Sequence, residues 1–92
     1  MTRKRSRLEI IRDILEVVKN RNGKIKPTQI LSKSNLSYQM LEAYLKELIE
    51  KDFLIEIRNK KNKTYAITEK GINYLIKFNL IQEFSDSFGL TK

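Results

Sequence analysis

The spacing of apolar residues changes twice along this sequence of 92 residues, and no other feature constrains the fold as strongly. Up to residue 51, apolar residues recur every three or four positions, a spacing that predicts amphipathic helices. Two short runs of alternating β-branched and aromatic residues follow, FLIEIR at 53–58 and KTYAIT at 63–68, and predict a hairpin. The helical spacing returns from residue 69. The sequence therefore predicts a mainly helical α+β domain in the order helix, helix, helix, hairpin, helix.

Each expected helix has a recognisable first residue. Three of these residues have hydroxyl groups that accept from free backbone N–H groups, and the fourth is a proline, which lacks the N–H that would be unpaired there. They are Ser6, Pro27, Ser37 and Thr68. Glu9 completes a capping box with Ser6. The expected helices cover about 6–21, 27–33, 38–51 and 69–84.

The apolar residues of the first three helices and the hairpin predict a single core. The first helix is expected to bury Leu8, Ile11, Ile14, Leu15 and Val18. The third is expected to bury Met40, Leu41, Tyr44, Leu45, Leu48 and Ile49. In the hairpin, we expect Phe53, Ile55 and Ile57 to face Tyr65 and Ile67, with Ile25 paired beside the strands.

The fourth helix has more apolar residues than one small core needs. One stripe, Ile72, Leu75 and Ile76, is expected to enter the core, and Gly71 is expected to mark close packing. A second stripe, Tyr74, Phe78, Ile81 and Phe84, is expected to form a homodimer interface, because it would otherwise be exposed. The loop between the strands lacks glycine, so Asn59 or Asn62 is expected to supply a positive φ.

Positive charge is segregated along the chain. The net charge is +8, and three blocks without any acidic residue hold 13 of the 19 cations. The blocks contain Arg3, Lys4, Arg5 and Arg7; then Lys19, Arg21, Lys24, Lys26 and Lys33; then Arg58, Lys60, Lys61 and Lys63. Any one block is equally compatible with an ordinary solvated surface. Three together indicate a polyanionic partner, and nucleic acid above all.

Several kinds of function are disfavoured by composition. The chain has no cysteine and no histidine, so thiolate metal sites and the commonest general base are excluded. We expect no enzyme activity, no cofactor and no metal site. No site for a small-molecule effector can be recognised in the sequence, and whether an effector exists stays open. No apolar run approaches the roughly 18 residues of a membrane span, so we expect a cytoplasmic protein associated with the nucleoid and not with membranes.

The predicted element order is the plan of a winged helix-turn-helix domain. In that plan the third helix enters the major groove and the hairpin, or wing, lies along the DNA backbone or in the minor groove. We expect residues 1–68 to form the DNA-binding core with a basic N-terminal arm. Residues 69–92 are expected to form a dimerisation helix with a loose tail.

Three stretches of the sequence resemble a known family. They are RSRLEIIRDILEVVKN, KPTQILSKSNLSYQMLEAYLKELIEKDFL and YAITEKGINYL, and together they span about residues 5–80. They are similar to the archaeal winged-helix family typified by the ten-kilodalton chromatin-associated DNA-binding proteins. The resemblance implies a chromatin-associated protein or a transcriptional regulator that dimerises through a long C-terminal helix. The last helix of this chain is shorter than that family's pattern.

The candidate DNA contacts are basic residues of the arm, the second helix and the wing, together with the start of the third helix. They are Arg3, Lys4, Arg5, Arg7, Lys24, Lys26, Lys33, Ser37, Tyr38, Gln39, Lys46, Arg58, Lys60, Lys61 and Lys63. Double-stranded DNA is the expected partner. Two alternatives stay open: a winged-helix module that binds another protein in a transcription or repair assembly, and an RNA-binding protein.

Overall fold

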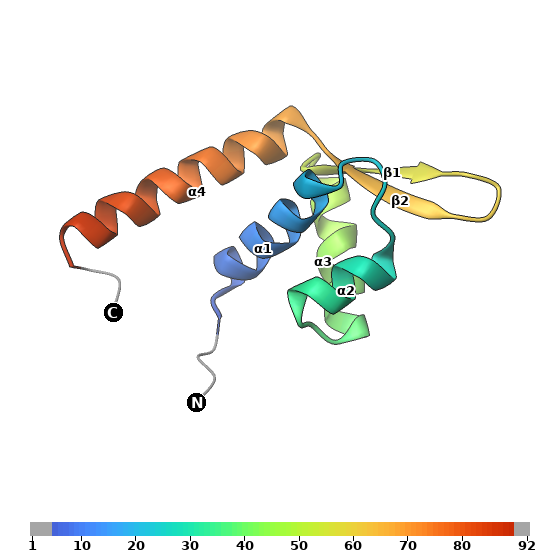
Figure 1. Ribbon diagram of the computed structural model, residues 1–92, viewed down its shortest axis with the longest axis horizontal. Helices are drawn as coiled ribbons and strands as arrows, with labels where there is room; N and C mark the ends of the chain where they lie inside the picture. Colours follow the sequence, from blue (N-terminus) through green and yellow to red (C-terminus); the bar gives the residue numbers. More distant parts are fainter. Residues whose placement is uncertain (1–4, 90–92) are drawn as a thin grey trace.

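A computed structural model describes residues 5–89. Three helices, a two-stranded antiparallel hairpin and a fourth helix follow one another (Figure 1). Their bounds are α1 (Arg7–Asn20), α2 (Pro27–Ser34), α3 (Tyr38–Glu50), β1 (Leu54–Arg58), β2 (Lys63–Ile67) and α4 (Glu69–Ser87). The predicted winged-helix order is therefore confirmed.

The predicted helix starts are also confirmed. Ser6 Oγ accepts from the backbone N–H of Glu9 at 3.2 Å, and the Glu9 carboxylate accepts from the N–H of Ser6 at 2.9 Å, which completes the capping box. The Ser37 and Thr68 side chains cap α3 and α4 by accepting from the backbone N–H groups of Met40 at 3.2 Å and Gly71 at 3.0 Å. These caps depend on residues three positions apart, which is why the sequence alone locates them.

The core lies between α1, α2, α3 and the inner face of the hairpin. Its most deeply buried side chains are Ile14, Leu15, Val18, Ile25, Ile30, Leu41, Leu48 and Leu54. In α1 and α3, the predicted burial of two residues is wrong: Leu8 is 55% exposed and Met40 is 45% exposed. The rest of the predicted stripe of α1, Ile11, Ile14, Leu15 and Val18, is buried, and so is Ile10, which borders it.

The faces of the hairpin differ from the prediction. Leu54 pairs with Ile67 and Glu56 pairs with Tyr65, so Ile55 and Ile57 lie on the opposite face. Leu54 is buried and Ile55 is 51% exposed. Side chains alternate between the two faces of a strand, so an error of one residue in register reverses all of them. The run Leu-Ile-Glu-Ile has apolar residues on both faces and does not decide between the two registers.

The predicted pairing of Ile25 at the edge of the hairpin is confirmed, whereas the predicted positive φ in its loop is wrong. Ile25 forms the expected short bridge with Tyr65, which places β2 between β1 and the segment before α2. The loop closes through the N–H of Asn59, which donates to the carbonyl of Asn62 at 2.8 Å. Neither asparagine has a positive φ; among the described non-glycine residues, Asn35 and Asp52 do.

The orientation of α4 is set at Gly71. A Cβ at this position would lie 2.5 Å from the Phe53 carbonyl oxygen and 2.6 Å from Ile67 Cγ1, so the predicted close packing is confirmed. Leu75, one turn further on, is consequently buried. Ile72 is 37% exposed and Ile76 is 51% exposed, so their predicted place in the core is wrong.

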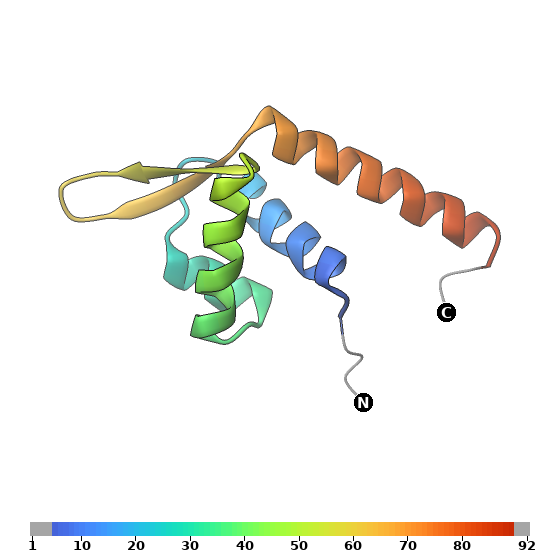
Figure 2. The same cartoon turned by 180° about the vertical axis from the view of Figure 1, so that it is seen from behind.

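The C-terminal part of α4 extends away from the rest of the molecule, on the side opposite the wing (Figures 1 and 2). Its first turns contact the hairpin, and Tyr74 reaches α1, where its hydroxyl donates to the Leu8 carbonyl at 3.0 Å. None of the described helices is both long and apolar enough to cross a membrane.

Candidate nucleic-acid interface

One face of α3 is open to solvent. Gln39, Ala43, Lys46 and Glu50 follow at intervals of four, three and four, so they share the face opposite the buried Leu41, Leu45 and Leu48. In Figure 2, α3 lies in front and no other element covers it. Of the predicted base-reading residues, Gln39 and Lys46 are on this face, and Tyr38 is on the flank that faces the wing.

A tight turn joins α2 to α3. Asn35 adopts a left-handed conformation with φ of 55°, and Ser34 Oγ donates to the Ile30 carbonyl at 2.6 Å. The Arg5 guanidinium donates to the Ser34 carbonyl at 2.7 Å and to Asp13 Oδ2 at 2.6 Å. Arg5 therefore links α1 to the turn that positions α3. Its side chain is 28% exposed, so little of this predicted DNA contact remains free for DNA.

Arg7 also has a partner within the protein. It forms an ion pair with Glu47 and lies 5.7 Å from the centroid of the Tyr44 ring. Glu47 accepts a second hydrogen bond from Lys51 Nζ at 2.9 Å. The hydrogen bonds from Lys51 and Arg7 hold the pKa of Glu47 below its usual value. The negative charge of Glu47 on α3 is thus compensated by two protein cations before any DNA approaches.

The wing projects beyond the helical body (Figure 1). Residues 58–63 surround a shallow hollow of about 210 Å³ whose lining consists of cationic and asparagine side chains. Lys60 and Lys61 are exposed at the tip, and neither forms an ion pair with any of residues 5–89. Exposed lysines at the tip of such a loop can bind the oxygens of phosphates.

The base of the wing contains an acidic residue that the sequence reasoning did not single out. Glu56 Oε1 accepts from Arg58 Nε at 3.0 Å, and Glu56 Oε2 lies 3.5 Å from Lys63 Nζ. The hydrogen bond from Arg58 holds the pKa of Glu56 below its usual value, against a smaller opposing effect of burial. The signal available in the sequence was a carboxylate two positions before a cation, which places both on the same face of one strand.

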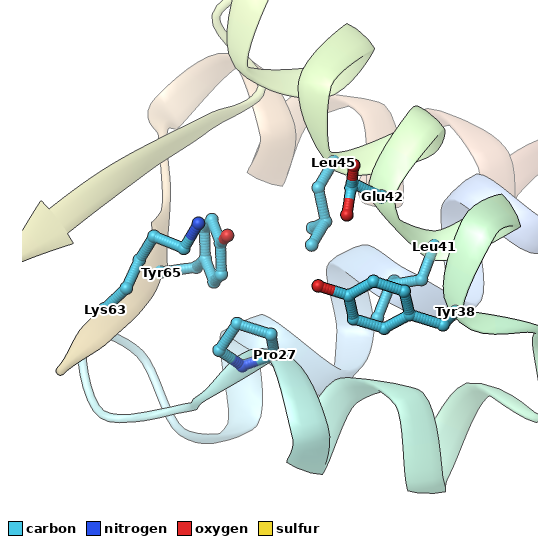
Figure 3. Close-up of a pocket in the computed structure, with 7 residues that line it drawn as sticks. All are labelled: Pro27, Tyr38, Leu41, Glu42, Leu45, Lys63 and Tyr65. Atoms are coloured by element: carbon cyan, nitrogen blue, oxygen red, sulfur yellow. The ribbon is translucent and has the colours of Figure 1, made fainter.

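A groove separates α3 from the wing. Its upper part, of about 370 Å³, is lined by Pro27, Tyr38, Leu41, Glu42, Leu45, Lys63 and Tyr65 (Figure 3). The Tyr38 hydroxyl points into this hollow, and Lys63 lies across from it beside Tyr65 (Figure 3). A second hollow of about 310 Å³ shares Glu42, Leu45, Lys63 and Tyr65 and adds Lys46, Ile49, Glu50 and Glu56. Leu41 and Leu45 make part of the groove apolar. Glu42 and Glu50 from α3 and Glu56 from β1 contribute carboxylates on its two sides.

The remaining predicted DNA contacts are distributed around α2 and the N-terminus. Lys24, Lys26 and Lys33 are exposed, before α2 and in its last turn. The Ser37 side chain accepts from the N–H of Met40, so its first role is to cap α3. Arg3 and Lys4 lie outside the described residues.

The four side chains predicted for a dimer interface differ in burial. Tyr74 packs edge-on against Phe53, with ring centroids 5.7 Å apart, and Phe78 lies 5.0 Å from the Arg12 guanidinium. Both are half-buried within the protomer, whereas Ile81 and Phe84 are exposed. The outward side of α4 consists of Ile76, Leu80, Ile81, Phe84 and Phe88, each more than half exposed, and is called the α4 apolar face below.

The sequence matches the winged helix-turn-helix family over residues 4–86, and the chain belongs to that family. No curated protein matches the sequence.

Solved structures share the fold at low sequence identity. Sso10a-2, a DNA-binding protein from Sulfolobus solfataricus, is 26% identical with a TM-score of 0.65, and the match covers 96% of this chain and 98% of that one. SSV1 F-93 is 22% identical with a TM-score of 0.69, covering 96% and 95%. S. aureus MepR, solved as a single-residue mutant bound to an oligodeoxyribonucleotide, is 13% identical with a TM-score of 0.74, covering 90% of this chain and 63% of that one.

Proposed function

We propose that this protein binds duplex DNA, with the outward face of α3 in the major groove and the wing on the phosphate backbone. One observation carries the proposal: Gln39 and Lys46 on the open face of α3 and Lys60 and Lys61 at the acid-free wing tip are all exposed, and α3 adjoins the base of that wing across one groove. Membership of the winged helix-turn-helix family supports it, as does the likeness to a DNA-binding protein along nearly the full length of both chains.

The chemistry of the two surfaces suggests two kinds of contact. Lysines at the wing tip and around α2 contact phosphates, which provides affinity without sequence information. Gln39 and Lys46 can donate to base edges, which provides a modest sequence preference. We infer a transcriptional regulator or a chromatin-associated protein.

A titration of purified protein on random-sequence duplex at several salt concentrations tests the proposal. If each protomer neutralises roughly 5–8 phosphates, log K should fall against log salt with a slope of about −5 to −7. A slope near zero contradicts the electrostatic account. Duplex RNA serves as the competitor: preference for RNA would support the RNA-binding alternative, and binding to neither would support a protein-interaction module.

We further propose that two copies associate through the α4 apolar face. A second copy is the fitting occupant because a two-fold axis brings the same patch of each copy together, so every apolar side chain meets another. Phe84 and Phe88 already contact each other, with ring centroids 4.8 Å apart. The proposed interface keeps Ile81 and Phe84 from the predicted one and is centred further from Tyr74 and Phe78, which are half-buried within the protomer. Such a dimer would present two α3 helices to successive major grooves.

A further inference from the structure

Two cations face each other where the wing hairpin opens into its loop. Arg58 and Lys63 are direct partners across the two strands. Like charges in directly opposite positions destabilise a hairpin. Glu56 precedes Arg58 by two residues, so its side chain lies on the same face of β1. Its two carboxylate oxygens are 3.0 Å from Arg58 Nε and 3.5 Å from Lys63 Nζ. One carboxylate is therefore shared by both cations.

The wing consequently has two kinds of cation. Lys60 and Lys61 at the tip have no ion pair among the described residues, and both are exposed. Arg58 and Lys63 at the base are held by Glu56, and the Lys63 side chain is turned toward the groove beside Tyr65 (Figure 3). A phosphate can contact the tip lysines without competition, whereas at the base it competes with the Glu56 carboxylate for Lys63 and for Arg58, whose side chain is 74% exposed and engaged only through Nε.

We propose that Glu56 competes with DNA phosphates for Arg58 and Lys63, so that these basal cations contribute fully to binding only when the wing is seated on the duplex. This inference rests on the proposed DNA binding and concerns the balance between loose and seated complexes. In a loose complex, only the tip lysines touch phosphate and the basal cations stay with Glu56. In a seated complex, the backbone lies close enough to compete for them.

The surroundings of Glu56 support this role. Glu42 and Glu50 line the same hollow as Glu56 and Lys63. A phosphate that entered the groove would meet these three carboxylates, so the backbone has to approach the basal cations from outside the groove. The hydrogen bond from Arg58 keeps the pKa of Glu56 low, and the carboxylate is therefore charged at neutral pH. A charged carboxylate competes with phosphate for the same donors.

The first test compares Glu56→Gln with Glu83→Gln. Glu83 is exposed on α4, so its replacement removes the same charge far from the wing. On random duplex, Glu56→Gln should bind roughly 5- to 10-fold more tightly at about 0.1 M salt and steepen the salt slope by about one, because one more phosphate is neutralised. Glu83→Gln should change both quantities much less. Equal changes in the two variants would overturn the proposal, and so would weaker binding by Glu56→Gln.

A second test removes the cations that Glu56 holds. In the Arg58→Gln/Lys63→Gln background, adding Glu56→Gln should no longer tighten binding. A gain that persists without the two cations would overturn the proposal. Thermal unfolding of each variant separates a disrupted hairpin from altered binding, since a folded protein keeps its transition. Failure of the wild-type protein to bind duplex with any salt dependence would instead contradict the proposed function itself, and the inference about Glu56 with it.

Discussion

Individual side chains on α3 have different capacities for recognition. Gln39 has an amide that can pair with the N6 and N7 positions of adenine, whereas Lys46 is a single donor that suits guanine or a phosphate. Ala43 lies between them on the same open face and leaves room for a base edge to approach. Glu47, on the flank, is already paired with Arg7 and Lys51. Sequence preference is therefore expected to depend chiefly on Gln39.

Replacing Gln39 with alanine tests this expectation. The difference in binding free energy between the best site and random duplex should shrink by about 1–3 kcal/mol, because one bidentate base contact is lost. Binding to random duplex should hardly change. Titrations on a selected site and on random DNA measure both quantities, and Gln82→Ala on α4 makes the same chemical change outside the proposed interface. Equal losses on the two DNAs would show that Gln39 contacts the backbone instead.

Gly71 is the residue at which a single methyl group should be most damaging. Alanine there would place Cβ 2.5 Å from the Phe53 carbonyl oxygen, and a backbone atom cannot move away easily. Overpacking of this kind costs about 1–3 kcal/mol, against a helix-propensity gain of up to about 1 kcal/mol. We expect a net loss of stability in urea unfolding. Asn73→Ala, at an exposed position of the same helix, should be neutral or slightly stabilising, and a similar result at Gly71 would contradict the packing account.

Among the elements, the wing combines a loop of four cations without acid with a far end that is buried in the core. Its tip residues are exposed, and the hairpin is anchored near its other end by Leu54, Tyr65 and Ile67. Substitutions at the tip should therefore alter DNA binding without altering stability. This separation makes the wing the element best suited to test the electrostatic contribution.

Replacing Lys60 with glutamine should weaken binding to all duplexes to a similar extent. The magnitude of the salt slope should fall by about one, because one phosphate contact is lost. Fluorescence anisotropy on two unrelated sequences at several salt concentrations measures both effects. Lys77→Gln on α4 removes the same charge far from the wing. Because Lys77 lies among the side chains of the α4 apolar face, the comparison requires that sedimentation gives this variant the wild-type mass, and its slope should then be nearly unchanged. An identical change in both variants would indicate that net charge matters and the wing does not.

At the scale of the whole molecule, the most prominent feature is the exposed apolar side of α4, which a partner could bury. The helix has 19 residues, which corresponds to about 28 Å at 1.5 Å per residue. Its α4 apolar face points away from the core of its own protomer, and complete burial of such side chains contributes roughly 1.5–3 kcal/mol each. Five of them are enough to offset a substantial part of the cost of association, which is on the order of 4–15 kcal/mol.

Replacing Leu80 and Phe84 with glutamate should separate the two copies, because unpaired charges would be buried in the seam. Sedimentation equilibrium should give about 22 kDa for the wild type, twice the chain mass of 10.9 kDa, and about 11 kDa for the double variant. Ile55→Glu, which changes an exposed apolar residue on the hairpin, is the control and should stay dimeric. A wild type near 11 kDa at high concentration, or a double variant that remains at 22 kDa, would contradict the dimer.

The sequence by itself determined the order of the elements and most of their ends. Caps such as Ser6 with Glu9, and Thr68 with the N–H of Gly71, act between residues three positions apart. Helical and strand spacings are likewise local. The close packing at Gly71 could also be predicted from the sequence. Glycine destabilises a helix, so it is expected in a first turn where a larger side chain has no room.

Only the tertiary structure decided which faces of these elements are buried and which charges are paired. The Leu-Ile-Glu-Ile run and α4 both have apolar residues on more than one side, so either side satisfied the local pattern. Arg5 with the Ser34 carbonyl and Arg7 with Glu47 are partners across 29 and 40 residues. Such pairs depend on how whole elements pack, because side chains far apart in the sequence meet only after the core has fixed the rotation of each helix and the register of the strands.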